Sequence, residues 1–229
     1  MANKLRYRHE MKFEISTGEY YILRSRLKAV MQSDPHTVNG KYLIRSIYFD
    51  NYRDKVLLEK INGYAKREKF RIRYYNDDFS VISLEKKMKI NDLYMKASAR
   101  ITEEECRKLL NGDRKWMAAH PSELVREFYT KLNTQLLRPR VLVSYTREPY
   151  IYKAGNVRVT FDMDIRSTVY GNEFLEKGVI NIGVGDTAGN MILEVKFDDY
   201  LPDVIADIIQ LGSCGRVAFS KYGACRRFG

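Results

Sequence analysis

The stretch VRVTFDMDIR, from Val157 to Arg166, alternates apolar and polar residues without a break. Residues two apart in a β-strand lie on the same face of the sheet, so Val157 and Phe161 point one way while their neighbours point the other. The stretch therefore predicts a strand with one apolar face and one charged face. On this spacing the charged face carries Arg158, Thr160, Asp162, Asp164 and Arg166.

The same alternation recurs in five further segments, whose charged faces carry Arg6, Arg8, Glu10, Lys12 and Glu14; Arg71 and Arg73; Glu85, Lys87 and Lys89; Lys96, Ser98 and Arg100; and Glu194 and Lys196. An ordinary antiparallel sheet with one solvated face explains any one of these strands. Six strands with charges at successive positions of one face favour a different interpretation. A sheet that closes on itself, with helices covering its apolar outside, encloses the charged faces.

The expected fold class is α+β, an antiparallel β-barrel-like tunnel with helices packed outside, in a single domain over residues 1–229. Strands are expected near 5–15, 40–50, 68–76, 79–90, 93–101, 139–153, 156–169 and 190–198. Helices are expected near 17–31, 52–61, 102–110 and 121–137, with a short helix after Pro202 and a last one over 220–227. The glycine-bearing stretch from Gly183 to Gly189 is interpreted as a hairpin connection and not as a phosphate-binding loop, because no Lys-Ser or Lys-Thr pair follows it.

The net charge limits the class of partner. Lys and Arg number 40 and Asp and Glu number 29, which gives +11 and favours a polyanion: nucleic acid, a membrane surface or phosphate chains. Cations on inward faces repel each other strongly unless an anion enters. Arginine offers bidentate hydrogen bonds to phosphate, lysine offers a point charge, and carboxylates are suitable ligands for Mg²⁺ or Mn²⁺.

Cysteine usage and hydropathy predict the compartment. The three cysteines, Cys106, Cys214 and Cys225, are odd in number and their spacing matches no metal motif, so we expect free thiols in a reducing compartment. No apolar run approaches the length of a membrane span, and charged residues follow the N-terminus where a signal peptide has its apolar core. The expected location is the cytoplasm.

Several short motifs occur in a fixed order along the chain: RHEMKF from Arg8, SIYFDN from Ser46, KFRIRY from Lys69, LEKK from Leu84, RVLVSYTR from Arg140, VRVTFD from Val157, LEVK from Leu193 and FSKY from Phe219. The ordered set resembles the VTC domain, the polyphosphate-polymerase branch of the triphosphate tunnel superfamily. It spans residues 8 to 222, nearly the whole chain. The resemblance implies a barrel-like tunnel in which basic residues bind phosphates and a carboxylate binds a metal ion.

The resemblance also implies roles for single residues. Phosphate binding is expected for Lys12, Arg71, Arg73, Lys87, Lys96, Arg147, Arg158 and Lys221, and for Lys196 beside Glu194. Arg71, Arg73, Lys221 and Glu194 are the expected catalytic residues. Glu194 matches the metal-binding carboxylate, Glu10 and Glu85 are candidates for a second one, and the expected metal is Mn²⁺ or Mg²⁺.

The chain departs from the superfamily at two positions. Arg8 stands where many members have the first Glu of a Glu-x-Glu-x-Lys motif, which favours the polymerase branch over the triphosphatases and adenylyl cyclases. Arg147 shares its expected face with Val143 and Tyr145, so a bulge or transition near Pro149 is predicted to turn it inward.

Three functions stay open at this point. The first is metal-dependent transfer of the ATP γ-phosphoryl group to a growing polyphosphate. The second is hydrolysis of inorganic or nucleoside triphosphate, and the third is a non-catalytic module that binds polyphosphate or RNA. A nucleic-acid partner is disfavoured because the cations are predicted to face inward. The sequence leaves open whether a partner protein supplies a membrane anchor.

Overall fold

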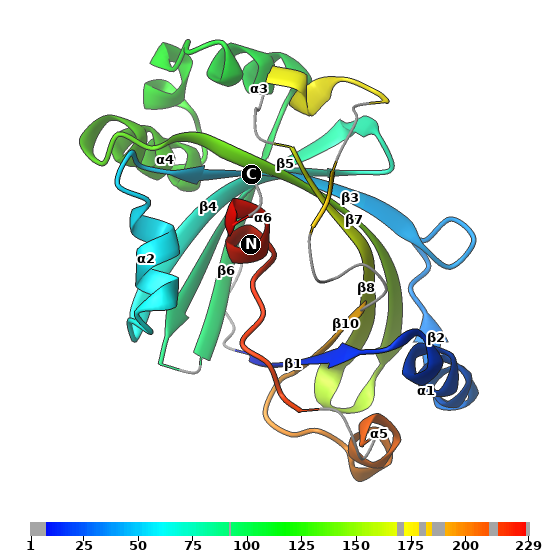
Figure 1. The fold of residues 1–229 in the computed structure, drawn as a ribbon. Coiled ribbons are helices and arrows are strands. Elements are labelled where there is room, and N and C mark those ends of the chain that lie inside the picture. Colours follow the sequence, from blue (N-terminus) through cyan, green and yellow to red (C-terminus); the bar gives the residue numbers. More distant parts are fainter. Residues whose placement is uncertain are drawn as a thin grey trace.

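In the computed structural model, the strands form one antiparallel sheet that curves into a barrel (Figure 1). The structure describes residues 8–91, 93–168, 172–178, 182–184, 191–210 and 215–227. The long strands follow the order β1-β10-β8-β7-β3-β4-β5-β6, with β2 paired to β7 and β9 paired to β8. Their bounds are β1 His9–Ile15, β2 Gln32–Ser33, β3 Tyr42–Asp50, β4 Lys66–Tyr75, β5 Asp78–Ile90, β6 Leu93–Ile101, β7 Arg138–Tyr152, β8 Val157–Thr168, β9 Ile182–Gly183 and β10 Met191–Phe197.

The barrel closes between β1 and β6, the two ends of this strand order. The backbone N–H of Arg8 donates to the carbonyl oxygen of Tyr94 at 3.2 Å, which makes an isolated bridge between the two ends. Inside the barrel, Lys87 Nζ on β5 lies 2.7 Å from Glu10 Oε2 on β1. Among the described residues, this backbone bridge joins β1 to β6, and the ion pair between Glu10 and Lys87 joins β1 to β5.

The helices are α1 Thr17–Val30, α2 Lys55–Ile61, α3 Glu103–Leu110, α4 Glu123–Thr134, α5 Asp203–Ile209 and α6 Lys221–Arg227, with 3₁₀ turns η1 Lys115–Ala119, η2 Ala154–Asn156 and η3 Asn172–Leu175. Of these, α1, α3, α4 and α5 cover the outside of the barrel on two sides. Both α1 and α3 begin with a capping box, Ser16 with Glu19 and Thr102 with Glu105, which satisfies two of the first free backbone N–H groups. These local signals explain why the expected helix starts agree with the observed ones.

Two apolar cores hold the helices against the outer face. One lies beneath α3 and α4, where Phe49 of β3 and Phe70 of β4 each place their ring 4.9 Å from that of Phe128. The other joins β8 and β10 to α1 and α5, with Leu23 and Val195 fully buried in it. The outward strand residues in both cores are the apolar members of the alternating segments, as that alternation requires.

A third apolar cluster lies on the inner face. Ile44, Val143 and Tyr145 share the inner face of β3 and β7 and pack against Tyr222 of α6. Consistent with this, α6 projects inside the ring of strands in Figure 1. The interior is thus divided into an apolar end closed by α6 and a charged remainder.

The predicted face of β8 is wrong beyond Asp162. The β7–β8 register shifts between Ser144 and Thr146, and Asp164 adopts φ 51°, which marks a β-bulge in β8. A bulge adds one residue and reverses which side chains face inward. As a result Asp164 and Arg166 are exposed on the outside, and Ile165 enters the inner apolar cluster.

The predicted bulge near Pro149 is also wrong. Pairing is regular through this part of β7, with Arg147 opposite Asp162 and Pro149 opposite Thr160. Arg147 points inward because its whole face of β7 does, including the apolar Val143 and Tyr145. The error came from equating an apolar strand face with the outside of the barrel.

The remaining expected elements occur within a few residues of their predicted bounds. The two-residue strands β2 and β9 and the 3₁₀ turns were not predicted. Arg6, Cys214 and residues 185–189 of the predicted hairpin connection lie outside the described residues. Within the described part of the chain, no helix has both the length and the apolar character that crossing a membrane requires.

Candidate functional site

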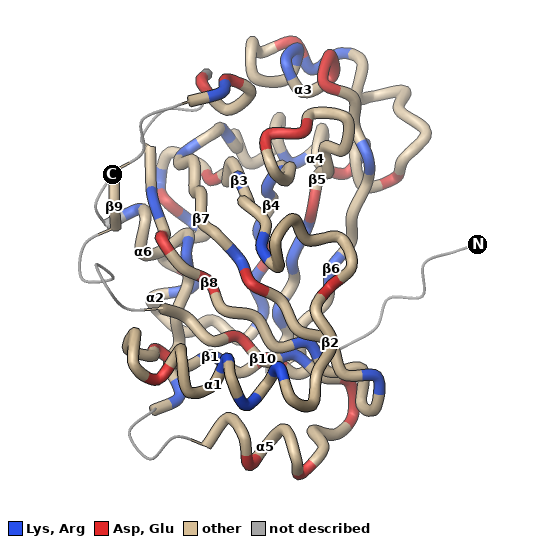
Figure 2. The backbone as a smooth tube through the Cα atoms, turned by 90° about the vertical axis from the view of Figure 1, so that its right-hand side faces the viewer, with Lys and Arg blue, Asp and Glu red and all other residues tan. Residues whose placement is uncertain are grey.

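A cavity of about 890 Å³ occupies the charged part of the barrel interior. Eleven Lys and Arg side chains line it, against four Asp and Glu side chains. Figure 2 shows that both signs of charge occur on strands all around the barrel. The cavity brings together every residue that the sequence predicted for the site: Glu10, Lys12, Arg71, Arg73, Glu85, Lys87, Lys96, Arg147, Arg158, Glu194, Lys196 and Lys221.

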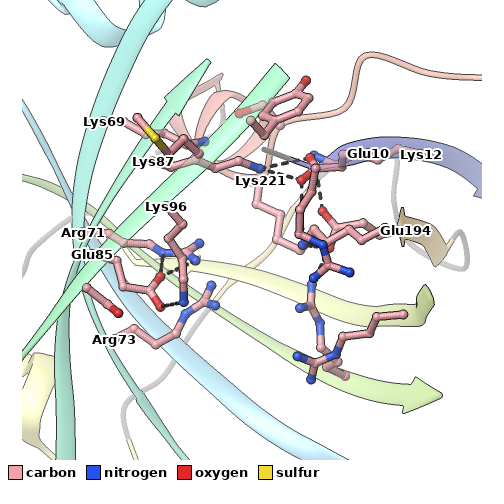
Figure 3. A pocket seen from close by; sticks show the side chains of 18 of the residues that line it. Glu10, Lys12, Lys69, Arg71, Arg73, Glu85, Lys87, Lys96, Glu194 and Lys221 are labelled. Carbon is pink, nitrogen blue, oxygen red and sulfur yellow. Dashed lines mark hydrogen bonds and ion pairs between the residues drawn. The ribbon is translucent and has the colours of Figure 1, made fainter. Parts of the chain in front are cut away.

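Strands β4, β5 and β6 supply one group of these residues through direct cross-strand neighbours. Arg71 is opposite Glu85 and donates from Nε to Glu85 Oε2 at 2.7 Å, while Lys96 Nζ of β6 lies 3.0 Å from Glu85 Oε1 (Figure 3). Lys87 follows Glu85 on the inner face. Lys86 points outward to Glu68 and Glu127.

Arg73 lies beside this group with a different set of partners. Its Nε donates to Ser46 Oγ and its Nη2 to the hydroxyl of Tyr145, both at 2.9 Å. Its side chain is therefore held by neutral hydroxyl groups at two of its nitrogens. A guanidinium fixed in this way keeps its charge available to an incoming anion, without a carboxylate that must first be displaced.

On the opposite wall, the inward-facing side chains of strands β1 and β10 alternate in charge along each strand and across the pair. Lys12 pairs with Glu194 across the ladder, and Glu10 pairs with Lys196. Lys12 Nζ lies 3.0 Å from Glu10 Oε1 and 3.8 Å from Glu194 Oε1, and Lys196 Nζ lies 3.0 Å from Glu194 Oε2. Opposite charges at facing positions stabilise the pairing of the two strands.

Both carboxylates of this wall are ionised at neutral pH. Burial raises the pKa of Glu10, and the nearby charge of Glu194 raises it further, but Lys87, Lys196 and Lys12 outweigh both and hold it far below its usual range. Burial likewise raises the pKa of Glu194, and the charges of Lys196, Arg147 and Lys12 reverse the shift. The two groups are therefore negative oxygen donors that already share cationic partners.

A buried network joins β7, β8 and α6 to this wall. Arg147 donates from Nε and Nη2 to the two oxygens of Asp162, at 2.6 and 2.8 Å, and from Nη2 to Glu194 Oε2 at 2.9 Å. Lys221, the first residue of α6, also pairs with Asp162. Asp162 has no exposed surface, and it positions two of the predicted phosphate-binding cations.

Two predicted phosphate-binding residues are more exposed than the others. Arg158 donates from Nη2 to Asp34 Oδ2 at 2.9 Å and to the hydroxyl of Tyr42, and its side chain is 36% exposed. The side chain of Lys96 is 54% exposed. Solvent screens both charges, so each contributes less to anion binding than a buried cation at the same distance.

Sequence reasoning missed Lys69, Tyr48, Tyr145, Ser220 and Asp162, all of which line the cavity or position residues that do. Lys69 could have been found, because it lies two residues before Arg71 and therefore on the same strand face. Within the described parts of the chain, no carboxylate is in ion-pair contact with Lys69. Burial, together with Lys12 and Arg71 and despite the opposing effect of Tyr48, lowers the pKa of Lys69 to about 8.

The carboxylates can hold a metal ion only with help from other ligands. Glu10 and Glu194 share Lys12 and Lys196, whereas Glu85 lies apart, between Arg71 and Lys96 (Figure 3). No three Asp, Glu, His or Cys side chains in the described segments come close enough to form a metal site. Glu10 and Glu194 together suit Mg²⁺ or Mn²⁺, provided that the ion keeps several waters and takes its other ligands from phosphate oxygens.

A second cavity, of about 700 Å³, adjoins the first on the side of α2 and the segment 216–220. The two share the side chains of Glu10, Lys12, Lys69, Lys87, Tyr94 and Ser220. The four charged residues among them therefore line both cavities.

Comparison with known proteins gives a family and a fold. The model of the VTC domain matches residues 7–228. No curated protein matches the chain. Among solved structures, a "putative adenylate cyclase" from Bacillus halodurans aligns with a TM-score of 0.51 at 16% identity over 84% of this chain and 81% of its own. A conserved hypothetical protein from Pyrococcus furiosus aligns with a TM-score of 0.45 at 13% identity, over 88% and 85%.

Proposed function

This chain belongs to the VTC domain family, and we propose that it is a metal-dependent phosphotransferase that uses ATP to extend polyphosphate. The observation that carries the proposal is the composition of the cavity inside the barrel, which is lined by eleven cationic side chains and only four acidic ones. A linear chain of phosphates has the charge, width and length to neutralise such an interior. A folded nucleic acid does not fit inside it.

Phosphoryl transfer of this kind needs positioning and charge stabilisation more than covalent chemistry. Arg71, Arg73 and Arg147 are held by hydrogen bonds before the substrate arrives, so little reorganisation is needed when charge develops on the phosphate oxygens. Lys221 and Lys69 add point charges to the lining of the same cavity. No protein nucleophile is required in this proposal.

Glu194 and Glu10 would hold Mg²⁺ or Mn²⁺ in the loaded enzyme, since both are ionised and turned toward the same point. The metal would supply neutralisation of charge on the phosphoryl oxygens. In the present arrangement Lys12 and Lys196 balance the two carboxylates. We also propose a cytoplasmic location, which fits the buried free thiols of Cys106 and Cys225.

The decisive experiment separates the three functions by their products. The protein is incubated with ATP and Mn²⁺ or Mg²⁺, long chains are resolved on a gel, and free phosphate is measured in parallel. We expect long polyphosphate chains. Free phosphate without chains would identify a triphosphatase and reject the polymerase, and tripolyphosphate binding without turnover would identify a binding module.

A pair of variants tests whether turnover depends on the carboxylate. Glu194→Gln keeps the size of the side chain and removes its charge, so turnover should fall by about 100-fold or more while tripolyphosphate still binds. Glu104→Gln, on the exposed surface of α3, is the matched control and should keep full activity. Equal activity in both variants would contradict the role proposed for Glu194.

A further inference from the structure

Tyr48 occupies an unusual position for a buried tyrosine. It lies on the inner face of β3 with 3% of its surface exposed, and its hydroxyl accepts a hydrogen bond from Arg71 Nη1 at 2.9 Å. Lys69 Nζ lies 5.5 Å from the centroid of its ring, and the ring of Tyr222 lies 5.4 Å away on the other side. The phenol is thus surrounded by cations and an aromatic ring.

In the described part of the chain, no carboxylate forms a hydrogen bond with the hydroxyl of Tyr48, which accepts from Arg71. Strand β4 presents Lys69, Arg71 and Arg73, and α6 presents Lys221 and Tyr222. Two acids at neighbouring positions already have partners. Glu85 of β5 is held by Arg71 and Lys96, and Asp50 of β3 accepts from the hydroxyl of Tyr222 at 2.6 Å. Tyr145 of β7, the remaining titratable neighbour, accepts from Arg73.

Other buried tyrosines show the opposite arrangement. Burial raises the pKa of Tyr20 and Tyr150, and both donate to Glu148 at 2.6 Å, which raises it further and keeps each phenol protonated. Tyr42 lines the same cavity and accepts from Arg158, yet burial raises its pKa. Tyr48 differs from these three phenols because it combines an arginine donor with a lysine over its ring, an arrangement that Tyr145 shares through Arg73 and Lys221.

We propose that Tyr48 is a phosphate-binding residue that takes up one proton from solvent when a phosphate chain binds. In the ligand-free cavity its phenolate balances part of the charge of Arg71 and Lys69. An incoming phosphate chain takes over those two cations and adds negative charge nearby. The phenolate oxygen then takes a proton from a hydronium ion or a buffer acid, which loses its own bond to that proton, and the new O–H donates to a phosphate oxygen. No other covalent bond forms or breaks.

The charges around Tyr48 determine how the affinity for a phosphate chain changes with pH. Burial raises the pKa of Tyr48, but Arg71, Lys69 and Arg73 outweigh it and leave the pKa at about 7. A bound anion restores it toward the ordinary value of about 10. Between these values the free protein lacks a proton that the complex carries, so affinity should fall by up to about tenfold per pH unit across this window. Below about pH 7 both forms are protonated and this dependence disappears.

The inference rests on the proposed function only in that phosphate chains must bind in the cavity. Tyrosinate absorbs ultraviolet light at longer wavelength than tyrosine, so it can be followed directly at about pH 8, between the two pKa values. Tripolyphosphate without metal is titrated into the wild-type protein, Tyr48→Phe and Tyr42→Phe. We expect the wild type and Tyr42→Phe to lose the absorbance of about one tyrosinate on binding, and Tyr48→Phe to show no loss.

The outcomes distinguish this inference from the proposed function. Tripolyphosphate that binds the wild type without any loss of tyrosinate absorbance overturns the role of Tyr48 and leaves the proposed function standing. The same loss in Tyr48→Phe also overturns it. A wild-type protein that binds no tripolyphosphate overturns both. If Tyr48→Phe does not fold, the same titration of Tyr75→Phe decides the question, because Tyr75 lines the cavity and Arg73 lowers its pKa against the effect of burial. A loss of absorbance that persists in Tyr75→Phe supports Tyr48, and a loss that disappears assigns the proton to Tyr75.

Discussion

Lys69 illustrates how a single binding residue can lower the stability of the protein that carries it. It is half-buried among cations, without a carboxylate in ion-pair contact among the described residues, and its pKa falls to about 8. Replacing it with methionine should stabilise the fold at neutral pH, on the order of 1–3 kcal/mol, because a desolvated charge is removed and the apolar part of the side chain is kept. The same change should weaken tripolyphosphate binding. Urea unfolding and a binding titration measure the two effects.

The stability difference between the wild type and Lys69→Met should change with pH in a defined direction. The pKa of Lys69 is lower in the folded protein than in the unfolded chain, where it is about 10.5. The unfolded chain therefore binds more protons between about pH 8 and 10.5, and wild-type stability gains over that of the variant as pH rises through this window. Lys66→Met, at an exposed position of the same strand, is the control. A destabilised Lys69→Met protein at pH 7 would contradict the argument.

Asp162, in contrast to Lys69, is a buried charge that stabilises the fold because it pairs with neighbouring buried cations. Its two oxygens hold Arg147, and Lys221 pairs with it as well. Asp162→Asn leaves two cations buried without that partner, so the free energy of unfolding should fall by about 3–5 kcal/mol. Asp198→Asn, at the partly exposed rim, should cost less than about 1 kcal/mol. Equal losses in urea unfolding would mean that the network contributes nothing specific.

At the scale of single elements, β8 contains the feature that most changes the site. The bulge places Asp164 at φ 51°, a conformation that costs glycine nothing and costs a β-branched residue most. Asp164→Gly should leave stability nearly unchanged, whereas Asp164→Val should lower it by about 1–3 kcal/mol. Thermal unfolding of the two variants tests this. A valine that is tolerated as well as glycine would show that the bulge is not maintained.

The same strand shows what alternation can and cannot predict. Regular alternation correctly placed Arg158 and Asp162 inside the barrel, because a strand with no bulge has a strict two-residue period. It failed at Asp164, since nothing in the sequence VRVTFDMDIR marks where an extra residue enters the ladder. In β7 the local signal was misleading. Val143 and Tyr145 face inward because α6 packs on them there, and such a contact with a distant segment cannot be read from β7 alone.

Helices were easier to predict than strand faces because their signals are local. The capping boxes at Ser16 and Thr102 fix two starts within a few residues of chain. The predicted site benefited for a similar reason. Most of its cations lie on long regular strands, so one correct face places several of them together. Asp162 was on the correct face as well, and only its role was missed, whereas Lys69 was not assigned to a face although it lies two residues before Arg71.

At the scale of the whole molecule, the fold separates buried apolar side chains from buried charged ones. Apolar cores lie mainly outside the barrel, beneath the helices, and the interior is largely charged. The interior charges do not balance, and like charges in a space of low dielectric repel each other. The folded protein therefore keeps an electrostatic cost that a suitable anion removes. Ligand binding should raise its stability by more than a general effect of salt.

The repulsion among the interior cations predicts that thermal stability depends on the length of the bound anion. At matched ionic strength, thermal stability should rise from phosphate to pyrophosphate to tripolyphosphate, because a longer chain meets cations on more strands at once. A ligand at about 100 times its Kd adds about 2.7 kcal/mol, which for a chain of this size corresponds to a rise in Tm of about 5–10 °C. Single-stranded RNA of equal total charge is the control, and it should produce a much smaller rise because the cations lie inside the barrel. Equal shifts with all of these anions would indicate screening of surface charge, and the interior would then not be the binding site.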